Sequence, residues 1–93
     1  LGAAFKNAKR LLQEKKYDAA AKEFVSVVDQ EPNAKFADKA LYNGAMAYIQ
    51  IKKYDSANKV LTRLVTDPRY RNSKFIELSL AQLAETARKF FDF

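Results

Sequence analysis

A four-residue word, Lys-Lys-Tyr-Asp, stands at positions 15–18 and again at positions 52–55 of this 93-residue chain, 37 residues further on. Self-similarity at a period of roughly 20–50 residues is typical of stacked supersecondary units, because one unit cannot bury its apolar face alone. The chain is therefore predicted to fold as a repeat array. The residues around the two words also correspond, in the pairs Ala8 with Ala45, Leu11 with Tyr48, Ala20 with Ala57, and Phe24 with Leu61.

A third copy begins near the C-terminus but stops halfway. We divide the chain into repeat 1 (about residues 1–34), repeat 2 (about 35–71) and half repeat 3 (about 72–93). Arrays normally close with a polar capping helix, whereas this chain ends in apolar residues, so the natural protein is expected to continue. The apolar positions of the third copy correspond to positions of the second. Leu80, Leu83, Ala84 and Ala87 match Leu41, Gly44, Ala45 and Tyr48, in that order.

Each complete repeat is predicted to contain two antiparallel helices. Apolar residues recur at spacings of three and four, and only two Gly and two Pro residues interrupt them. Asp18 and Asp55 are predicted N-caps, and Pro32 and Pro68 are predicted to end the helices before them. The fold class is thus all-α, a superhelix of about two and a half helix pairs. The five predicted helices cover about residues 2–14, 18–30, 35–51, 55–66 and 72–90.

Small residues are predicted to mark the crossing of the two helices in each pair. Backbones approach closely only where side chains are small, and larger residues then fill the flanks. The residues concerned are Ala8 with Ala20 in repeat 1, and Gly44 and Ala45 with Ala57 in repeat 2.

These positions carry a resemblance to tetratricopeptide repeats. The family pattern places a bulky residue, Leu-Gly and Tyr on a first helix, then Ala, Phe and a closing Pro on a second. The resemblance implies an α–α superhelix whose first helices line a concave face, and a protein–protein interaction scaffold that is not an enzyme. The residues that resemble the pattern are Ala20, Phe24 and Pro32 in repeat 1, and Leu41, Gly44, Ala45, Tyr48, Ala57 and Leu61 in repeat 2.

The repeats are longer than those of the family. Their period is 37 to 39 residues, against about 34 for the family. The additional residues lie at 33–39 and 68–74, and the strings 33–37 and 72–75 resemble the extended first helices of bacterial cell-envelope tetratricopeptide proteins. That resemblance implies extended first helices here, and it favours the bacterial periplasm or cell envelope over the cytoplasm.

By the same resemblance, side chains of the first helices form the surface that binds another protein or peptide. Tyr42 and Met46 lie one helical turn apart with Asn43 beside them, and an aromatic ring, a thioether and an amide suit a peptide contact. The alternative is that Tyr42 and Met46 only pack against neighbouring helices. The predicted concave-face residues are Phe5, Lys9, Lys39, Tyr42, Asn43, Met46, Gln82 and Glu85.

One specialised form of peptide binding is disfavoured. Family members that bind chaperone tails hold a C-terminal carboxylate with Lys, Asn, Asn, Lys and Arg on three successive first helices. Only Asn43 agrees with that set. The matching positions hold Phe5, Lys9, Asn43, Leu78 and Gln82.

Basic residues recur at the turns, and stacked repeats would align them into a ridge. The net charge of +6 permits a second hypothesis, in which this ridge binds nucleic acid or an anionic surface. Binding of single-stranded nucleic acid requires aromatic residues between the cations, and the ridge lacks that pattern. We therefore favour solvated turns, and nucleic acid is disfavoured as a ligand. A third hypothesis is a structural spacer with no ligand of its own. The ridge residues are Lys15, Lys16, Lys52, Lys53, Arg88 and Lys89; a further basic cluster, Arg69, Tyr70, Arg71 and Lys74, is interpreted as solvated too.

Composition excludes several kinds of chemistry. The chain has no Cys and no His, so its own residues form no disulfide, thiolate nucleophile, zinc cluster or imidazole base. Its apolar runs are shorter than a transmembrane helix requires. We expect no catalysis, no metal ion and no cofactor.

At the C-terminus, one helix cannot bury Phe90, Phe91 and Phe93 together, and this end is predicted to mediate self-association.

Overall fold

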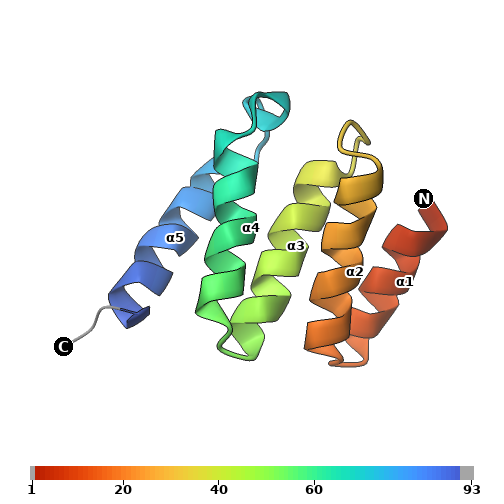
Figure 1. Cartoon of the computed structure of the whole chain (residues 1–93), viewed down its shortest axis with the longest axis horizontal. Coiled ribbons are helices and arrows are strands. Elements are labelled where there is room, and N and C mark those ends of the chain that lie inside the picture. Colours follow the sequence, from red (N-terminus) through yellow and green to blue (C-terminus); the bar gives the residue numbers. More distant parts are fainter. Residues whose placement is uncertain (1, 91–93) are drawn as a thin grey trace.

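The computed structural model describes residues 2–90, and these form five α-helices joined by turns (Figure 1). No strand occurs within that range, which confirms the predicted all-α class. A short 3-10 helix, η1, precedes the last α-helix. The elements are α1 (Gly2–Gln13), α2 (Tyr17–Gln30), α3 (Ala37–Gln50), α4 (Tyr54–Thr66), η1 (Pro68–Tyr70) and α5 (Ile76–Phe90).

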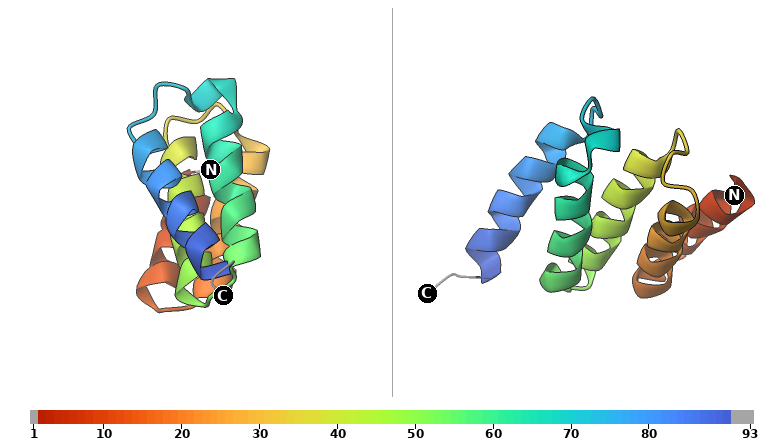
Figure 2. Two further views of the ribbon diagram at one scale, coloured as in Figure 1. Left: turned by 90° about the vertical axis from the view of Figure 1, so that its left-hand side faces the viewer. Right: turned by 45° about the horizontal axis from the view of Figure 1, so that its top comes forward.

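The helices stand side by side in chain order, and each packs mainly against its neighbours in the sequence. Viewed from the end of the row, α1, α3 and α5 lie on one side of the molecule and α2 and α4 on the other (Figure 2, left). The extents of 43 × 31 × 17 Å describe an elongated slab. This shape follows from repetition, because each unit contacts only the units next to it.

The core runs along the row of helices as fully buried side chains of two sizes. The largest apolar ones include Phe24, Leu41, Leu61 and Leu64, all of them 0% exposed. Alanines lie between these large residues and let the helices approach one another. The alanines predicted to lie at helix crossings are equally buried, namely Ala8, Ala20, Ala45 and Ala57.

Gly44 lies against α2 of the preceding repeat. A Cβ atom added to Gly44 would stand 3.3 Å from the Cβ of Phe24 and 3.5 Å from the carbonyl oxygen of Ala21. The prediction that Gly44 marks the crossing within its own pair is therefore wrong. Because α3 packs on both α2 and α4, it needs a small residue where its backbone comes close to α2.

The repeated Lys-Lys-Tyr-Asp word forms the turn that ends each first helix. Lys15 has a left-handed backbone, with φ of 62°. The N–H of Lys16 donates to the carbonyl of Leu11 at 2.9 Å, and the N–H of Lys15 to that of Leu12 at 3.0 Å. The second copy repeats both bonds at 2.9 Å around Lys52, whose φ is 60°. This bond pair is the Schellman motif, which satisfies the last carbonyls of a helix.

Asp18 and Asp55 are not the N-caps that the sequence predicted. Each second helix begins one residue earlier, and a lysine holds its N-cap position without a side-chain cap bond. The reason is that the preceding turn closes at Lys16, whose carbonyl already accepts the N–H of Ala20 at 2.8 Å. Asp18 instead accepts a hydrogen bond from Lys53 Nζ at 2.8 Å, which joins the two turns.

The additional residues of each repeat form turns at 33–36 and 71–74, whereas residues 37–39 begin α3 and residues 68–70 form η1. Segments 32–36 and 71–75 connect one repeat to the next, although the predicted helices included residues 35–36 and 72–75. The N–H of Ala34 donates to the carbonyl of Glu31 at 3.1 Å, and the N–H of Ala37 to that of Ala34 at 3.0 Å. Such bonds between residues three apart fold the chain into tight turns, so the expectation of extended first helices is wrong.

Among the described residues, α5 has a helix on one side only. It packs against α4, where Thr86 Oγ1 donates to Asn58 Oδ1 at 2.5 Å. Leu80 is 51% exposed, whereas the corresponding Leu41 is fully buried because α3 lies between two helices. Phe91 and Phe93 of the predicted association end, and the side chain of Phe90, lie outside the described part of the chain.

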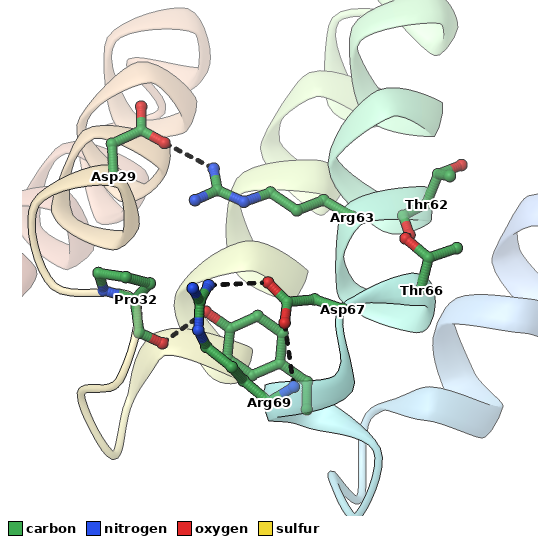
Figure 3. A network of polar contacts seen from close by, with 8 residues as sticks. Asp29, Pro32, Thr62, Arg63, Thr66, Asp67 and Arg69 are labelled. Atoms are coloured by element: carbon green, nitrogen blue, oxygen red, sulfur yellow. Dashed lines mark hydrogen bonds and ion pairs between the residues drawn. The ribbon is translucent and has the colours of Figure 1, made fainter.

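Polar contacts join the second helix and linker of repeat 1 to those of repeat 2 (Figure 3). Asp29 Oδ1 of α2 accepts from the Arg63 guanidinium of α4 at 2.6 Å. The hydroxyl of Tyr70 donates to the carbonyl oxygen of Pro32 at 2.6 Å. These contacts hold the two inter-repeat linkers at the same end of the molecule.

Tyr70 is buried, which corrects the interpretation of its basic cluster as solvated. Only 6% of the residue is exposed. Burial raises the pKa of Tyr70 above its usual value of 10.0, and the nearby carboxylate of Asp67 raises it further. The phenol is therefore held in its neutral, hydrogen-bonding form.

Replacing Lys52 by Gly is expected to raise the free energy of unfolding by about 0.5–1 kcal/mol, because a left-handed residue with a Cβ atom is strained. Lys53→Gly is the comparison, since φ at Lys53 is −86°; the added chain entropy and the loss of the bond to Asp18 both lower stability there. Urea unfolding followed by circular dichroism measures both. Equal changes in the free energy of unfolding of the two variants would contradict the left-handed turn at Lys52.

Tyr70→Phe is expected to lower the free energy of unfolding by about 1 kcal/mol at neutral pH, since the Pro32 carbonyl loses its donor. Because the pKa of Tyr70 is raised, wild type has the higher free energy of unfolding below about pH 10. This difference from Tyr70→Phe is lost as the pH rises toward the raised pKa. Urea unfolding across this alkaline range measures the difference. Tyr54→Phe is the control, because its hydroxyl bonds none of the described residues. A difference in the free energy of unfolding that stays constant with pH would contradict the role assigned to the Tyr70 hydroxyl.

Candidate partner-binding surface

The side chains predicted to bind a partner come from α1, α3 and α5, which lie on one side of the molecule (Figure 2). Gly44 of α3 contacts α2, and residues two positions away project about 200° around a helix. Tyr42 and Met46 therefore point away from α2, with Asn43 between them in the sequence. We define the first-helix face as Phe5, Lys9, Lys39, Tyr42, Asn43, Met46, Gln82 and Glu85.

Tyr42 also takes part in packing between repeats. Its ring stacks on Phe75 with centroids 5.2 Å apart and planes at 27°. Phe5 stacks in the same way on Phe36, at 4.7 Å and 20°. Each stack joins a first helix to the residue just before the next first helix. Sequence reasoning missed Phe36 and Phe75, although the repeated Lys-Phe pair, 39 residues apart, is a signal for them.

The remaining members of the first-helix face are split between packing and solvent. Met46 packs partly against the core, as Tyr42 does. The two hypotheses for these residues, partner contact and internal packing, are therefore compatible, since each side chain keeps an accessible part. Lys9 lies with its Nζ 5.7 Å from the centroid of the Phe5 ring. Exposed members are Lys9 and Lys39, and half-buried members are Phe5, Tyr42, Asn43, Met46, Gln82 and Glu85.

Several residues of the predicted basic ridge are engaged in ion pairs. Lys16 Nζ lies 3.2 Å from Glu14 Oε1, and Lys53 Nζ 2.8 Å from Asp18 Oδ1. The hydrogen bond from Lys16 is the main cause that lowers the pKa of Glu14, and that from Lys53 lowers the pKa of Asp18. These pairs reduce the positive charge that the turns present to a ligand.

The rest of the ridge serves the fold in other ways. Arg88 pairs with Glu85, and Lys89 Nζ lies 5.8 Å from the centroid of the Tyr54 ring. Lys15 and Lys52 occupy the left-handed positions of the two Schellman turns. The repetition of these cations thus has a structural explanation in the turns themselves.

Within residues 2–90, no three acidic side chains are grouped so that they would hold a metal ion. None of the described helices combines the length and the apolar character that crossing a bilayer requires.

A scan against protein-family models matches residues 11–70 to the family described as Tetratricopeptide repeat. No curated protein and no solved structure matches the chain significantly. The matched region extends from the end of α1 through α2, α3 and α4 to η1, and so covers more than half of the chain. It contains both copies of the repeated turn word, the buried alanines Ala20, Ala45 and Ala57, and the inter-repeat contact at Gly44. The chain belongs to the tetratricopeptide repeat family, whose helix pairs are typically non-catalytic protein-interaction modules.

Proposed function

We propose that this chain is a scaffold that holds a partner protein on its first-helix face. The observation that carries the proposal is that Tyr42 and Met46, one turn apart on α3, lie two positions either side of Gly44 and so point away from α2. Membership of a family of interaction repeats supports it. A segment of the partner would lie across α1, α3 and α5.

The chemistry of this face suits a segment with both apolar and polar groups. Met46 offers a flexible, polarisable contact that adapts to different side chains. Asn43 has both a donor and an acceptor, which matches the N–H and carbonyl groups of a peptide backbone. Exposed Lys9 and Lys39 add positive charge at the border. Apolar contacts of this kind supply binding energy, and the polar groups around them set the register.

The basic ridge gives the alternative proposal, a binder of nucleic acid or of an anionic surface. The ion pairs of Lys16, Lys53 and Arg88 weigh against it. Binding to generic duplex DNA that falls steeply with salt would favour this alternative. A spacer without any ligand is the third possibility, and it would show neither peptide nor DNA binding.

A location in the bacterial cell envelope stays a proposal that rests on the strings 33–37 and 72–75. The turns in these segments weaken it, because the implied extension of the first helices is absent within residues 2–90. Cell fractionation with antibodies against the full-length protein tests it, and recovery in the cytoplasm alone would contradict it.

The scaffold proposal predicts that a phage-displayed peptide library yields ligands for the isolated chain. A selected peptide is expected to shift the amide NMR signals of residues 42–46 on α3. Met46→Ala is expected to weaken its binding about tenfold, or roughly 1.4 kcal/mol, since a central apolar contact is lost. Thr62→Ala, at an exposed position of α4, is the matched control and should change affinity less than about twofold.

Two results would contradict this proposal. One is a library that yields no saturable ligand. The other is a set of ligands whose signals shift on α2 and α4, with Thr62→Ala weakening binding as much as Met46→Ala does.

We also propose that isolated chains associate through α5. Leu78 and Leu80 are both 51% exposed on α5, and large apolar side chains left in water favour association. Sedimentation velocity at rising protein concentration is expected to show a growing dimer fraction, and Leu80→Lys is expected to reduce it. Lys59→Ala, at an exposed position of α4, is the control. A strict monomer at high concentration would contradict the proposal.

A further inference from the structure

A groove lies between the two inter-repeat linkers, beside the first turns of α3 and α5. Its volume is about 510 Å³, within the range of roughly 300–1,000 Å³ that is usual for ligand pockets. It comes from the segments that lengthen these repeats, so it lies apart from the centre of the first-helix face. We define this loop groove by its lining residues, Lys35, Phe36, Asp38, Lys39, Asn72, Ser73, Lys74 and Phe75.

The charge of the loop groove is unbalanced. Lys35, Lys39 and Lys74 are exposed at its rim, and within residues 2–90 none of their ammonium groups forms an ion pair. The single acidic residue in the lining, Asp38, is already engaged. Its Oδ2 accepts from Ser73 Oγ at 2.6 Å, and its Oδ1 accepts from the backbone N–H of Lys39 at 2.8 Å. Three cations without acidic partners therefore surround the groove, in contrast to the paired cations of the turns.

The apolar part of the groove comes from Phe36 and Phe75, which are half-buried. One face of Phe36 is stacked on Phe5, and one face of Phe75 on Tyr42. Lys74 Nζ lies 5.6 Å from the centroid of the Phe75 ring. Binding of single-stranded nucleic acid relies on ring faces that are free to stack with bases. One face of each ring is already stacked, so the rings offer bases fewer free faces, and their remaining half-buried surface suits contact with an apolar side chain.

We propose that the loop groove docks an acidic peptide segment of a partner protein, in which Asp or Glu residues flank an apolar side chain. The carboxylates pair with Lys35, Lys39 and Lys74, where charge-assisted hydrogen bonds replace water. The apolar side chain packs against Phe36 and Phe75. This is a second contact surface, which shares only Lys39 with the first-helix face, and it goes beyond the partner site proposed there.

The shape of the surface suits an extended segment. A second hollow of about 280 Å³ adjoins the loop groove and shares Lys35, Asp38, Asn72 and Ser73 with it. It continues along the linkers toward Arg69 and Tyr70. The hydrogen bond between Ser73 and Asp38 ties the second linker to the first turn of α3, so the groove is formed before a ligand arrives. A preformed site lowers the entropy cost of binding.

Fluorescence polarisation at low ionic strength tests this proposal with a labelled, end-blocked hexapeptide, Asp-Glu-Leu-Phe-Asp-Glu. Saturable binding is expected, with Lys74→Glu weakening it at least about tenfold because one attraction becomes a repulsion. Lys59→Glu makes the same charge change on α4 and should weaken binding less than about threefold. Lys74→Gln is expected to give a smaller loss in the same direction, and it serves if Lys74→Glu does not fold.

Further probes separate the contributions to binding. Replacing Leu-Phe by Ser-Ser in the peptide, or its acidic residues by Lys, should each abolish saturable binding. Met46→Ala should leave binding of the acidic peptide unchanged, so this proposal and the first-helix-face proposal fail separately. The loop-groove proposal is overturned if the acidic peptide does not bind, if Lys74→Glu and Lys59→Glu lower its affinity equally, or if an oligo-thymidine binds more tightly than the peptide.

Discussion

The close contact between α3 and α2 at Gly44 is the constraint on which the rest of the structure depends. A Cβ atom at this position would stand 3.3 Å from the Cβ of Phe24, so the distance between the two repeats is set by the absence of a side chain. Buried alanines play the same role at the other helix contacts. Because the spacing between repeats is small, the linkers at one end of the molecule and the turns at the other come within hydrogen-bonding reach.

Polar contacts then define the register of one repeat against the next. Lys53 bonds Asp18 between the turns, Arg63 bonds Asp29 between the second helices, and Tyr70 bonds Pro32 between the linkers. The exposed ion pairs contribute little to stability, since water and salt screen them. The bond of Tyr70 is worth more because the residue is buried. Packing therefore sets the distance between repeats, and these contacts select one alignment.

The distribution of cations separates structure from recognition. At the turns, lysines end helices or pair with carboxylates, so that the repeated word is explained by the fold. In the linkers and the first turn of α3, Lys35, Lys74 and Lys39 have no acidic partner among the described residues, and they surround two phenylalanine rings. The same stacks that hold Phe36 and Phe75 also engage Phe5 and Tyr42 of the first-helix face. The two proposed contact surfaces thus share supporting residues while differing in their chemistry.

The sequence by itself determined the repetition, the number and order of the helices, and the small residues between them, because helical periodicity and breakers are local properties of the chain. It did not determine which helix Gly44 contacts, or that Asp18 bonds a lysine of the next repeat, since both depend on how repeats stack. The exposure of Leu80, which the matching Leu41 does not share, is also decided by whether a neighbouring helix is present. The loop groove belongs to the tertiary structure alone, because its residues come from the two linkers and the start of α3, which the packing of α3 and α5 on α4 brings together.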